Sequence, residues 1–461
     1  MTFTFLIVRI SFIRTLSLLS SIICILLFFT ISVIAGDSHT DKKYSYDDWS
    51  TPEYCGSSCH VDIYQQWRQS MMSQSYTHHW DEIEYFNLAI PHAEKDEVVA
   101  EVKEGCNGCH APMSFLVGDV PPPRPEENSR ANEGVHCDFC HTITGFEGDI
   151  PFNFNYVVDP KGPKLGPRLD PVSPSHKTMK SDFLASGDFC GICHNEKDPY
   201  GIWVKSTHLE WKEGPYYDQG VKCQDCHMTY GSMVTASMGP KYEDARLHLF
   251  HGGHDPGKVR GVVELRINPD IREAEPGEDV RFTVALFNQK TGHKFPTGSV
   301  EDRILWLHVE AIDNNGNTYH LPVDKKGFEG EEYTIGADVL AYQDMGIALN
   351  DPNFEGVQRD GIPIGDRIFR MPYFDPQGRM TIQQWNTKTL GVDYRIGPRE
   401  TKMETFTFTV PDDAVPGEMK ITATLNYQLL VKPIAEFLNV PSEESGIMEV
   451  NNHSTFIEVL P

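Results

Sequence analysis

Five short cysteine motifs constrain the first half of this chain more than any other feature. Ten of its eleven cysteines form five pairs, and each pair is followed directly by a histidine. The motifs are CGSSCH at 55–60, CNGCH at 106–110, CDFCH at 137–141, CGICH at 190–194 and CQDCH at 223–227. Whatever these motifs hold must be accommodated five times within one region, so it must form much of the interior there.

A C-x-x-C-H motif is typical of covalent haem c attachment. The two thiols form thioethers with the haem, and the adjacent imidazole binds the iron axially. Zinc sites and disulfides are the alternatives, because C-x-x-C alone also suits tetrahedral zinc. Neither requires a histidine directly after the second cysteine. The five repeats of that histidine therefore predict five covalently bound haem c groups.

Each motif supplies two attachment cysteines and one proximal histidine. The attachment residues are Cys55, Cys59, Cys106, Cys109, Cys137, Cys140, Cys190, Cys193, Cys223 and Cys226, and the proximal ligands are His60, His110, His141, His194 and His227. The first motif has three residues between its cysteines instead of two. We expect this extra residue to bulge outward so that both sulfurs reach one porphyrin, and Gly56 with two serines makes such a bulge easy.

The N-terminal segment has the layout of an export signal. Residues 15–36 carry no charge and follow Arg9 and Arg14, as in a secretory signal peptide. The apolar run is also long enough to remain as an uncleaved membrane anchor, and the sequence leaves both alternatives open. In either case residues 37–461 are expected outside the cytoplasm, in the periplasm or the extracellular space.

The chain is strongly acidic. It has 66 Asp and Glu against 40 Lys and Arg, which gives a net charge of −26. This charge argues against nucleic acid or anionic lipid as partners and favours a cationic or neutral docking patch on a redox protein. The alternative is that the acidity only keeps an exported protein soluble.

The sequence pattern changes near residue 258. Before it, short helix-like segments alternate with loops rich in proline and glycine, such as 118–128 and 159–175. After it, apolar and polar residues alternate with a period of two, most clearly in 279–288, 304–313, 403–410 and 419–425. Turn signals such as Asn315-Gly316 separate these runs.

We therefore divide the chain into an N-terminal segment (1–36), a five-haem cytochrome c domain (37–258) and a β domain (259–461). The predicted fold is multidomain. An α/loop multihaem domain with little regular structure precedes an all-β immunoglobulin-like sandwich.

The ligand opposite each proximal histidine decides between an electron carrier and an enzyme. Two axial imidazoles give a low-spin iron that is closed to substrate, whereas an open iron binds small molecules. Nine further histidines lie in the haem region, which exceeds the number that five irons need. The sequence alone does not pair these histidines with individual haems.

The chain resembles the exported multihaem cytochromes of the c554-like class, which often carry a C-terminal β domain with a GHxFPTG motif. The resemblance rests on GVHCDFCHTITG at 134–145, SPSHKTM at 173–179, HLFHGGH at 248–254 and TGHKFPTG at 291–298. It covers most of the chain after the N-terminal segment. It implies His176 and His248 as the first distal ligands, followed by His136, His254 and His293.

Met72 departs from the pattern of that class, which usually has histidine at this place. Methionine also binds haem iron, and His/Met ligation raises the reduction potential relative to two histidines. We therefore predict Met72 as the distal ligand of the haem held by His60. The alternatives are Met71, His78 or His79 as the ligand, or an open iron.

Taken together, the motifs predict an exported pentahaem cytochrome that passes electrons between redox proteins or other cytochromes. An oxidoreductase acting on a small nitrogen or sulfur compound at one open haem is the alternative from a different class. A subunit of an extracellular conducting filament is a third. Electron transfer is favoured over catalysis because no CxxCK motif marks a catalytic haem. The sequence does not decide whether the chain forms an oligomer.

Overall fold

The computed structural model describes residues 43–169, 171–324, 340, 342–351 and 353–461. Tyr44–Pro461 form one compact unit. The segment 1–36, for which the sequence predicts a signal peptide or an anchor, lies outside the described residues. Among the residues that are described, no helix is long and apolar enough to span a membrane.

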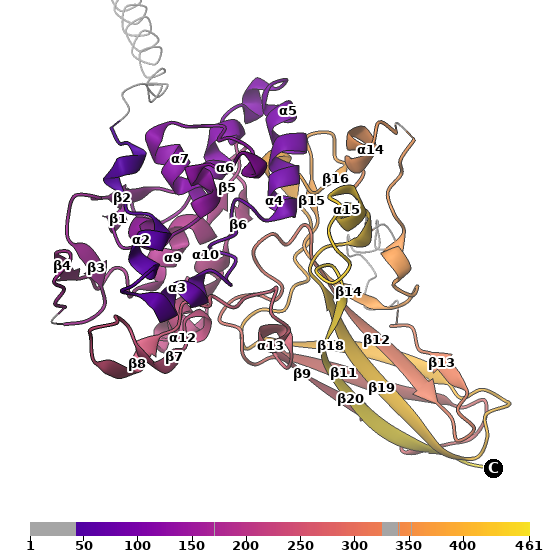
Figure 1. Ribbon diagram of the computed structural model, residues 1–461. Coiled ribbons are helices and arrows are strands. Elements are labelled where there is room, and N and C mark those ends of the chain that lie inside the picture. Colours follow the sequence, from indigo (N-terminus) through magenta and orange to yellow (C-terminus); the bar gives the residue numbers. More distant parts are fainter. Residues whose placement is uncertain (1–42, 170, 325–339, 341, 352) are drawn as a thin grey trace, which may run out of the picture. The chain divides into compact units, whose positions relative to one another are not determined.

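The region of the five motifs consists of short helices joined by long loops (Figure 1). Its helices are α2 (Pro52–Gly56), α3 (Val61–Trp67), α4 (His79–Glu84), α5 (Ile90–Ala93), α6 (Val102–His110), α7 (Pro112–Val117), α8 (Cys137–Cys140), α9 (Gly187–His194), α10 (Thr207–Lys212), α11 (Pro215–Asp218), α12 (Cys223–His227) and α13 (Pro256–Val259). A π-helical turn at Tyr85–Ala89 lies between α4 and α5. The predicted region with little regular structure is thereby confirmed.

The described part of this region also contains four two-stranded ladders. They pair β1 (Ile143–Phe146) with β2 (Tyr156–Val158), β3 (Lys164–Gly166) with β4 (Thr178–Lys180), β5 (Glu196–Lys197) with β6 (Trp203–Lys205), and β7 (Tyr230–Val234) with β8 (Lys241–Arg246). Elements this short bury little apolar surface by themselves, since a two-stranded hairpin is marginally stable in water. The region therefore depends on something beyond its own secondary structure.

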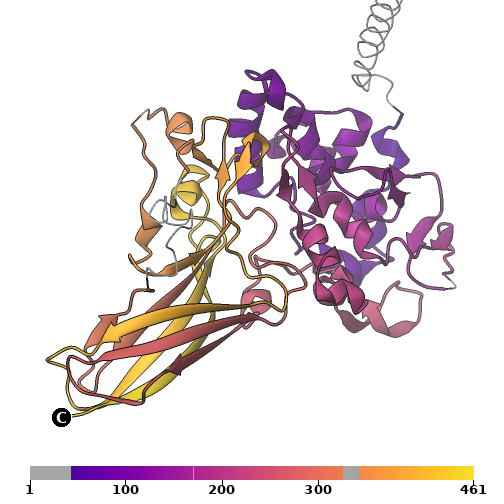
Figure 2. The ribbon, with the colours of Figure 1, turned by 180° about the vertical axis from the view of Figure 1, so that it is seen from behind.

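The C-terminal region is rich in β-structure and contains two main sheets. One has the order β10-β20-β19-β12-β13, with β14 also paired to β12, and the other has the order β18-β11-β9. The strands are β9 (Val263–Pro269), β10 (Glu273–Ala274), β11 (Asp279–Asn288), β12 (Ile304–Ile312), β13 (Thr318–His320), β14 (Arg367–Phe369), β18 (Thr401–Thr409), β19 (Gly417–Gln428) and β20 (Ile447–Val459). Figure 2 shows their long strands from behind.

The period-two pattern of the sequence correctly predicted the strands. The run 279–288 coincides with β11, and the other three predicted runs fall on β12, β18 and β19. Their inward residues share one core: Phe282 and Leu286 of one sheet lie in the same buried cluster as Leu307 and Ile421 of the other. At Asn315-Gly316 the chain turns, with Gly316 at φ 87°, a left-handed conformation that glycine adopts without strain.

The main sheets are accompanied by two short helices and a small three-stranded sheet. The helices are α14 (Met345–Ala348) and α15 (Lys432–Phe437), and the strands are β15 (Tyr373–Phe374), β16 (Met380–Thr381) and β17 (Thr389–Leu390). The C-terminal region is therefore β-rich and not purely β. These elements belong to a second core that also contains residues of the motif region. Trp306 of β12 lies in this core together with Leu88 and Val102, so apolar packing crosses the predicted boundary near residue 258.

Candidate haem-binding site

Four of the five motifs lie on or directly beside a helix of their own. α6, α9 and α12 each contain both cysteines of a motif and end at its histidine, and α8 holds the third motif with His141 as the next residue. In this third motif the His141 amide donates to the Cys137 carbonyl at 3.0 Å, a normal helical bond four residues back. A single helical turn thus presents the two thiols and the imidazole together.

The first motif accommodates its extra residue as the sequence predicts. The His60 amide donates to the Cys55 carbonyl at 3.0 Å, five residues back instead of four, which is the bond of a π-type turn. Ser57, Ser58 and Cys59 are exposed, so the chain bulges outward. Gly56 is required here because a Cβ atom would come within 2.1 Å of the Tyr64 ring.

Four of the five motif histidines are oriented by backbone carbonyls. Nδ1 lies 2.7 Å from Thr235 O in His60, 2.8 Å from Ser75 O in His110, 2.5 Å from Leu165 O in His141 and 2.6 Å from His251 O in His227. A carbonyl oxygen accepts only, so Nδ1 carries the proton and donates. Nε2 is left unprotonated and available to a metal, the usual arrangement of a metal-binding histidine.

Three of the proximal imidazoles face a second imidazole. The ring centroids of His60 and His176 are 6.4 Å apart, those of His141 and His248 are 6.5 Å apart, and those of His227 and His293 are 6.3 Å apart. When two imidazoles bind one metal ion from opposite sides, each metal–nitrogen distance is about 2.0 Å, and the two ring centroids are then about 6 Å apart. All three pairs have the spacing of two axial ligands on one iron.

The three facing histidines are held in the same way as the proximal ones. Nδ1 lies 3.2 Å from Lys177 O in His176, 3.0 Å from Arg246 O in His248 and 2.8 Å from Lys294 O in His293. Burial lowers the pKa of His227 and of His248 to about 4 and also lowers the pKa of His293. These imidazoles are therefore neutral at pH 7, as a metal ligand must be.

The residues present fit covalently bound haem c. All ten motif cysteines are free thiols, and in three motifs an imidazole pair with the spacing of axial ligands accompanies them. In the other two motifs, His110 and His194 make no close ring contact with any residue that the structure describes. Burial lowers the pKa of His194 to about 4.

The other predicted distal ligands lie elsewhere. Met72 accepts a hydrogen bond from the Val135 amide through its carbonyl, at 2.9 Å, and it is His176 that faces His60. His136 is buried and caps α8, because its Nδ1 accepts from the Asp138 amide at 3.2 Å. The structure does not test whether Met72 or His136 binds iron, and both assignments stay predictions.

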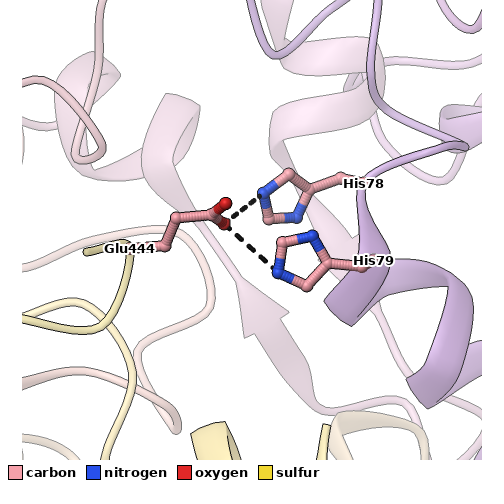
Figure 3. Close-up of side chains that lie close together, drawn as sticks. All are labelled: His78, His79 and Glu444. Carbon is pink, nitrogen blue, oxygen red and sulfur yellow. Dashed lines mark hydrogen bonds and ion pairs between the residues drawn. The ribbon is translucent and has the colours of Figure 1, made fainter. Parts of the chain in front are cut away.

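His254 belongs to a cluster with His78, His79 and Trp80. The ring centroid of His254 is 5.7 Å from that of His78 and 5.1 Å from that of Trp80. Figure 3 shows His78 and His79 pointing at the Glu444 carboxylate, with Nε2 to Oε2 distances of 3.1 Å and 3.3 Å. No motif histidine faces the His254 ring in the described part of the chain, so its ligand role also stays a prediction.

Contacts between motif residues show which motifs are neighbours in space. The thiols interact in three pairs: Cys55 with Cys137, Cys109 with Cys193, and Cys190 with Cys223. Numbered in chain order, motif 1 is therefore next to motif 3, motif 2 next to motif 4, and motif 4 next to motif 5. Phe139 of motif 3 and Ile192 of motif 4 lie in the same buried cluster, which puts motif 3 near motif 4.

The loop that carries His293 is anchored to the motif region by Glu210 of α10. The Glu210 carboxylate pairs with the Arg395 guanidinium at 2.8 Å, and both side chains are at least 95% buried. It also accepts from the Lys294 amide at 3.2 Å and the Thr297 hydroxyl at 2.8 Å. Sequence reasoning missed Glu210 and Arg395, because a lone acid and a lone base far apart in the chain carry no local signal.

Comparison with known proteins shows which class of protein this chain is similar to. The sequence model of the family described as cytochrome c554 and c-prime matches residues 54–142, which include the first three motifs. No curated protein sequence matches the chain.

Among solved structures, the chain is similar to a penta-haem cytochrome c552 from Thermochromatium tepidum, with a TM-score of 0.60 and 19% sequence identity. This match covers 89% of the present chain and 99% of that one. The CARDB domain of a Pyrococcus furiosus protein also matches, over 44% of this chain and 91% of that chain. Its TM-score of 0.18 and identity of 12% are too low to indicate a shared fold. The family match and the penta-haem fold together support a multihaem cytochrome with haem c as its cofactor.

Proposed function

We propose that this chain is an exported pentahaem c-type cytochrome that passes electrons between redox proteins. The observation that carries the proposal is the set of three facing histidine pairs, each beside a C-x-x-C-H motif. Bound haem c supplies one-electron transfer between ferric and ferrous iron. Two imidazoles on one iron leave no site for substrate, which suits a carrier.

The chain's own residues would hold the cofactors in a defined way. The ten motif cysteines form the thioethers, and His60, His110, His141, His194 and His227 are the proximal ligands. We assign His176, His248 and His293 as the distal ligands opposite His60, His141 and His227. Each of these six imidazoles donates from Nδ1 to a backbone carbonyl, which fixes the ring orientation and increases the basicity of Nε2.

The neighbour relations among the motifs define the route. The described contacts connect motif 1 to motif 3, motif 3 to motif 4, and motif 4 to both motif 2 and motif 5. Motif 4 is therefore the branch point. Electrons that arrive at motif 1 would pass through motifs 3 and 4 before leaving at motif 2 or motif 5.

The wider setting follows from the sequence. Export through residues 1–36, periplasmic or extracellular location and protein redox partners are parts of this proposal, as are the domains 37–258 and 259–461. The two sheets that share one core in the second domain support an immunoglobulin-like sandwich. Its role would be to present His293, which explains why an electron carrier keeps a region without a haem motif.

Intact-mass measurement of the denatured, purified protein tests the haem count, and we expect five retained haems. Electron paramagnetic resonance tests the ligation, and we expect at least three low-spin ferric signals typical of two imidazoles. Four haems would mean that CGSSCH is not an attachment site. A spectrum dominated by high-spin iron would contradict the paired histidines.

A second candidate function is supported by His110 and His194, which make no close ring contact in the part of the chain that the structure describes. An open position at either iron would admit a small nitrogen or sulfur compound. Carbon monoxide binding to the reduced protein distinguishes the two functions: a carrier with every iron closed does not bind it, whereas an enzyme with one open haem binds one equivalent.

A further inference from the structure

Three side chains of the C-terminal region, His308, His320 and Asp366, meet at one edge of the six-stranded sheet. β12 pairs with β19 on one side and with both β13 and β14 on the other. His320 is paired with Glu310 in the β12–β13 ladder, and Asp366 directly precedes β14. His308 lies on β12 between these two ladders, so the three side chains come together where β13 and β14 approach each other.

The three side chains, named the β-edge cluster here, are arranged around one carboxylate. His308 Nδ1 lies 3.0 Å from each carboxylate oxygen of Asp366, and His320 Nε2 lies 2.8 Å from Oδ1. The imidazole rings are parallel, with an interplanar angle of 6° and centroids 5.3 Å apart. One ligand atom from each residue lies within 4.8 Å of the others.

Burial sets this cluster apart from an ordinary surface ion pair. The Asp366 side chain is 0% exposed, while His308 and His320 are 27% and 34% exposed. A buried carboxylate is unfavourable without a positive partner. Arg359 Nη2 donates to the Asp366 carbonyl at 2.7 Å, which holds the backbone of this residue in place. The Asp366 backbone is therefore held by Arg359, and the Asp366 carboxylate contacts both imidazoles.

The distances are slightly shorter than those around a tetrahedral metal ion. With metal–nitrogen and metal–oxygen distances of about 2.0–2.2 Å, neighbouring ligand atoms are about 3–3.5 Å apart. The nitrogen–oxygen distances of 2.8 Å and 3.0 Å are close to this range. Two nitrogens and one carboxylate favour a transition metal such as zinc, because calcium and magnesium prefer oxygen ligands only.

We propose that His308, His320 and Asp366 bind one divalent transition-metal ion of the zinc class, with water at the remaining, solvent-facing position. The ion would bind side chains on or next to β12, β13 and β14 and so stabilise the pairing of these strands at the sheet edge. This site is independent of the haem motifs and of the proposed electron-transfer function. The competing explanation is a hydrogen-bonded cluster in which both facing nitrogens keep their protons.

Equilibrium dialysis of the full-length holoprotein against Zn²⁺, followed by metal analysis per chain, tests the proposal. We expect one zinc per chain in the wild type. His320→Gln and Asp366→Asn should each weaken zinc binding by at least about tenfold, since second-shell changes alone cost that much. Zinc should also raise the thermal unfolding midpoint of the wild type and not that of either variant.

Two control variants make the result specific. His453→Gln changes a histidine of β20 outside the cluster, and Glu444→Gln removes the acid shared by His78 and His79. Both should retain the zinc of the wild type. No bound zinc, zinc that survives both cluster variants, or zinc lost only in Glu444→Gln would each overturn the proposal. Because His320 is partly exposed, its variant keeps the test valid if Asp366→Asn does not fold.

Discussion

The motif region and the β-rich region build their interiors in different ways. In the β-rich region, alternate residues of two sheets form one continuous apolar core, with Val284, Leu305 and Ala423 fully buried. In the motif region the clusters are smaller, and the helices that bear the motifs are four to nine residues long. The first interior is made of side chains, whereas we propose that haem groups complete the second.

The two regions are nevertheless one compact unit. His293 of the β-rich region faces His227 of the motif region, and the buried Glu210–Arg395 pair connects the same two segments. A region that folds by apolar alternation thus places an imidazole opposite one of the motif histidines, where we propose that it binds the iron of a haem. The comparison can be tested by changing each kind of interior separately.

Removing a haem from the branch point should have the largest effect. We expect Cys190→Ala combined with Cys193→Ala to lose one haem and to destabilise the motif region as a whole, because motif 4 neighbours motifs 2, 3 and 5. Intact mass gives the haem count, and protease sensitivity reports the folding of the region. The matched change of Cys55 and Cys59 should also lose one haem but leave the other four spectroscopically unchanged. Equal, mild effects of both changes would contradict the branch point.

Breaking the Glu210–Arg395 connection between the two regions should have the second-largest effect. Glu210→Gln removes one of the two carboxylates paired with the buried Arg395 guanidinium, and Asp393 remains at 2.8 Å. The loss of stability should therefore be below the roughly 3–5 kcal/mol that breaking a buried ion pair costs. The loop of His293 should loosen, so one haem should become partly high-spin and bind carbon monoxide. Glu213→Gln changes an exposed acid that follows the same helix and serves as the control. An unchanged spin state together with unchanged stability would show that Glu210 does not position His293.

A cavity in the side-chain core should have a smaller and more local effect. Leu307→Ala removes a side chain that is 0% exposed, and such changes cost about 2–5 kcal/mol. Chemical denaturation should show this loss while the haem absorption spectrum of the native protein stays the same. Lys420→Ala, on an exposed position of β19, should change the stability by less than about 0.5 kcal/mol. A haem spectrum altered by Leu307→Ala would mean that the two interiors are not separate.

Features that depend on a local sequence pattern could be predicted, whereas features that depend on packing between distant segments could not. Strand β11 was predicted at its bounds because a period-two pattern is local, and the motifs were found because C-x-x-C-H is contiguous. The position of His176 opposite His60 depends on how distant loops pack. The sequence therefore indicated several candidate distal histidines but not which of them lies opposite which motif histidine. The shared core of Trp306 and Val102 crosses the predicted domain boundary for the same reason.

Met72 shows where a local pattern competes with packing. The sequence pattern led us to predict it opposite His60, whereas the His176 ring, whose centroid is 6.4 Å from that of His60, leads us to propose His176 for that place. We therefore expect Met72→Leu to have the smallest effect of all these changes. Leucine keeps the volume and apolar character of methionine and removes only the sulfur, and volume-conserving exchanges usually cost less than about 1.5 kcal/mol.

The decisive measurement is the near-infrared absorption of the ferric protein, where a methionine ligand gives a characteristic band. With His176 as the ligand, the wild type lacks this band and Met72→Leu leaves all five reduction potentials unchanged. His176→Ala is the counterpart: it should make one haem high-spin and able to bind carbon monoxide, because His60 then has no partner. A band in the wild type that disappears in Met72→Leu would restore methionine ligation. His176 would then be an exposed loop residue whose orientation toward His60 has no role in binding iron.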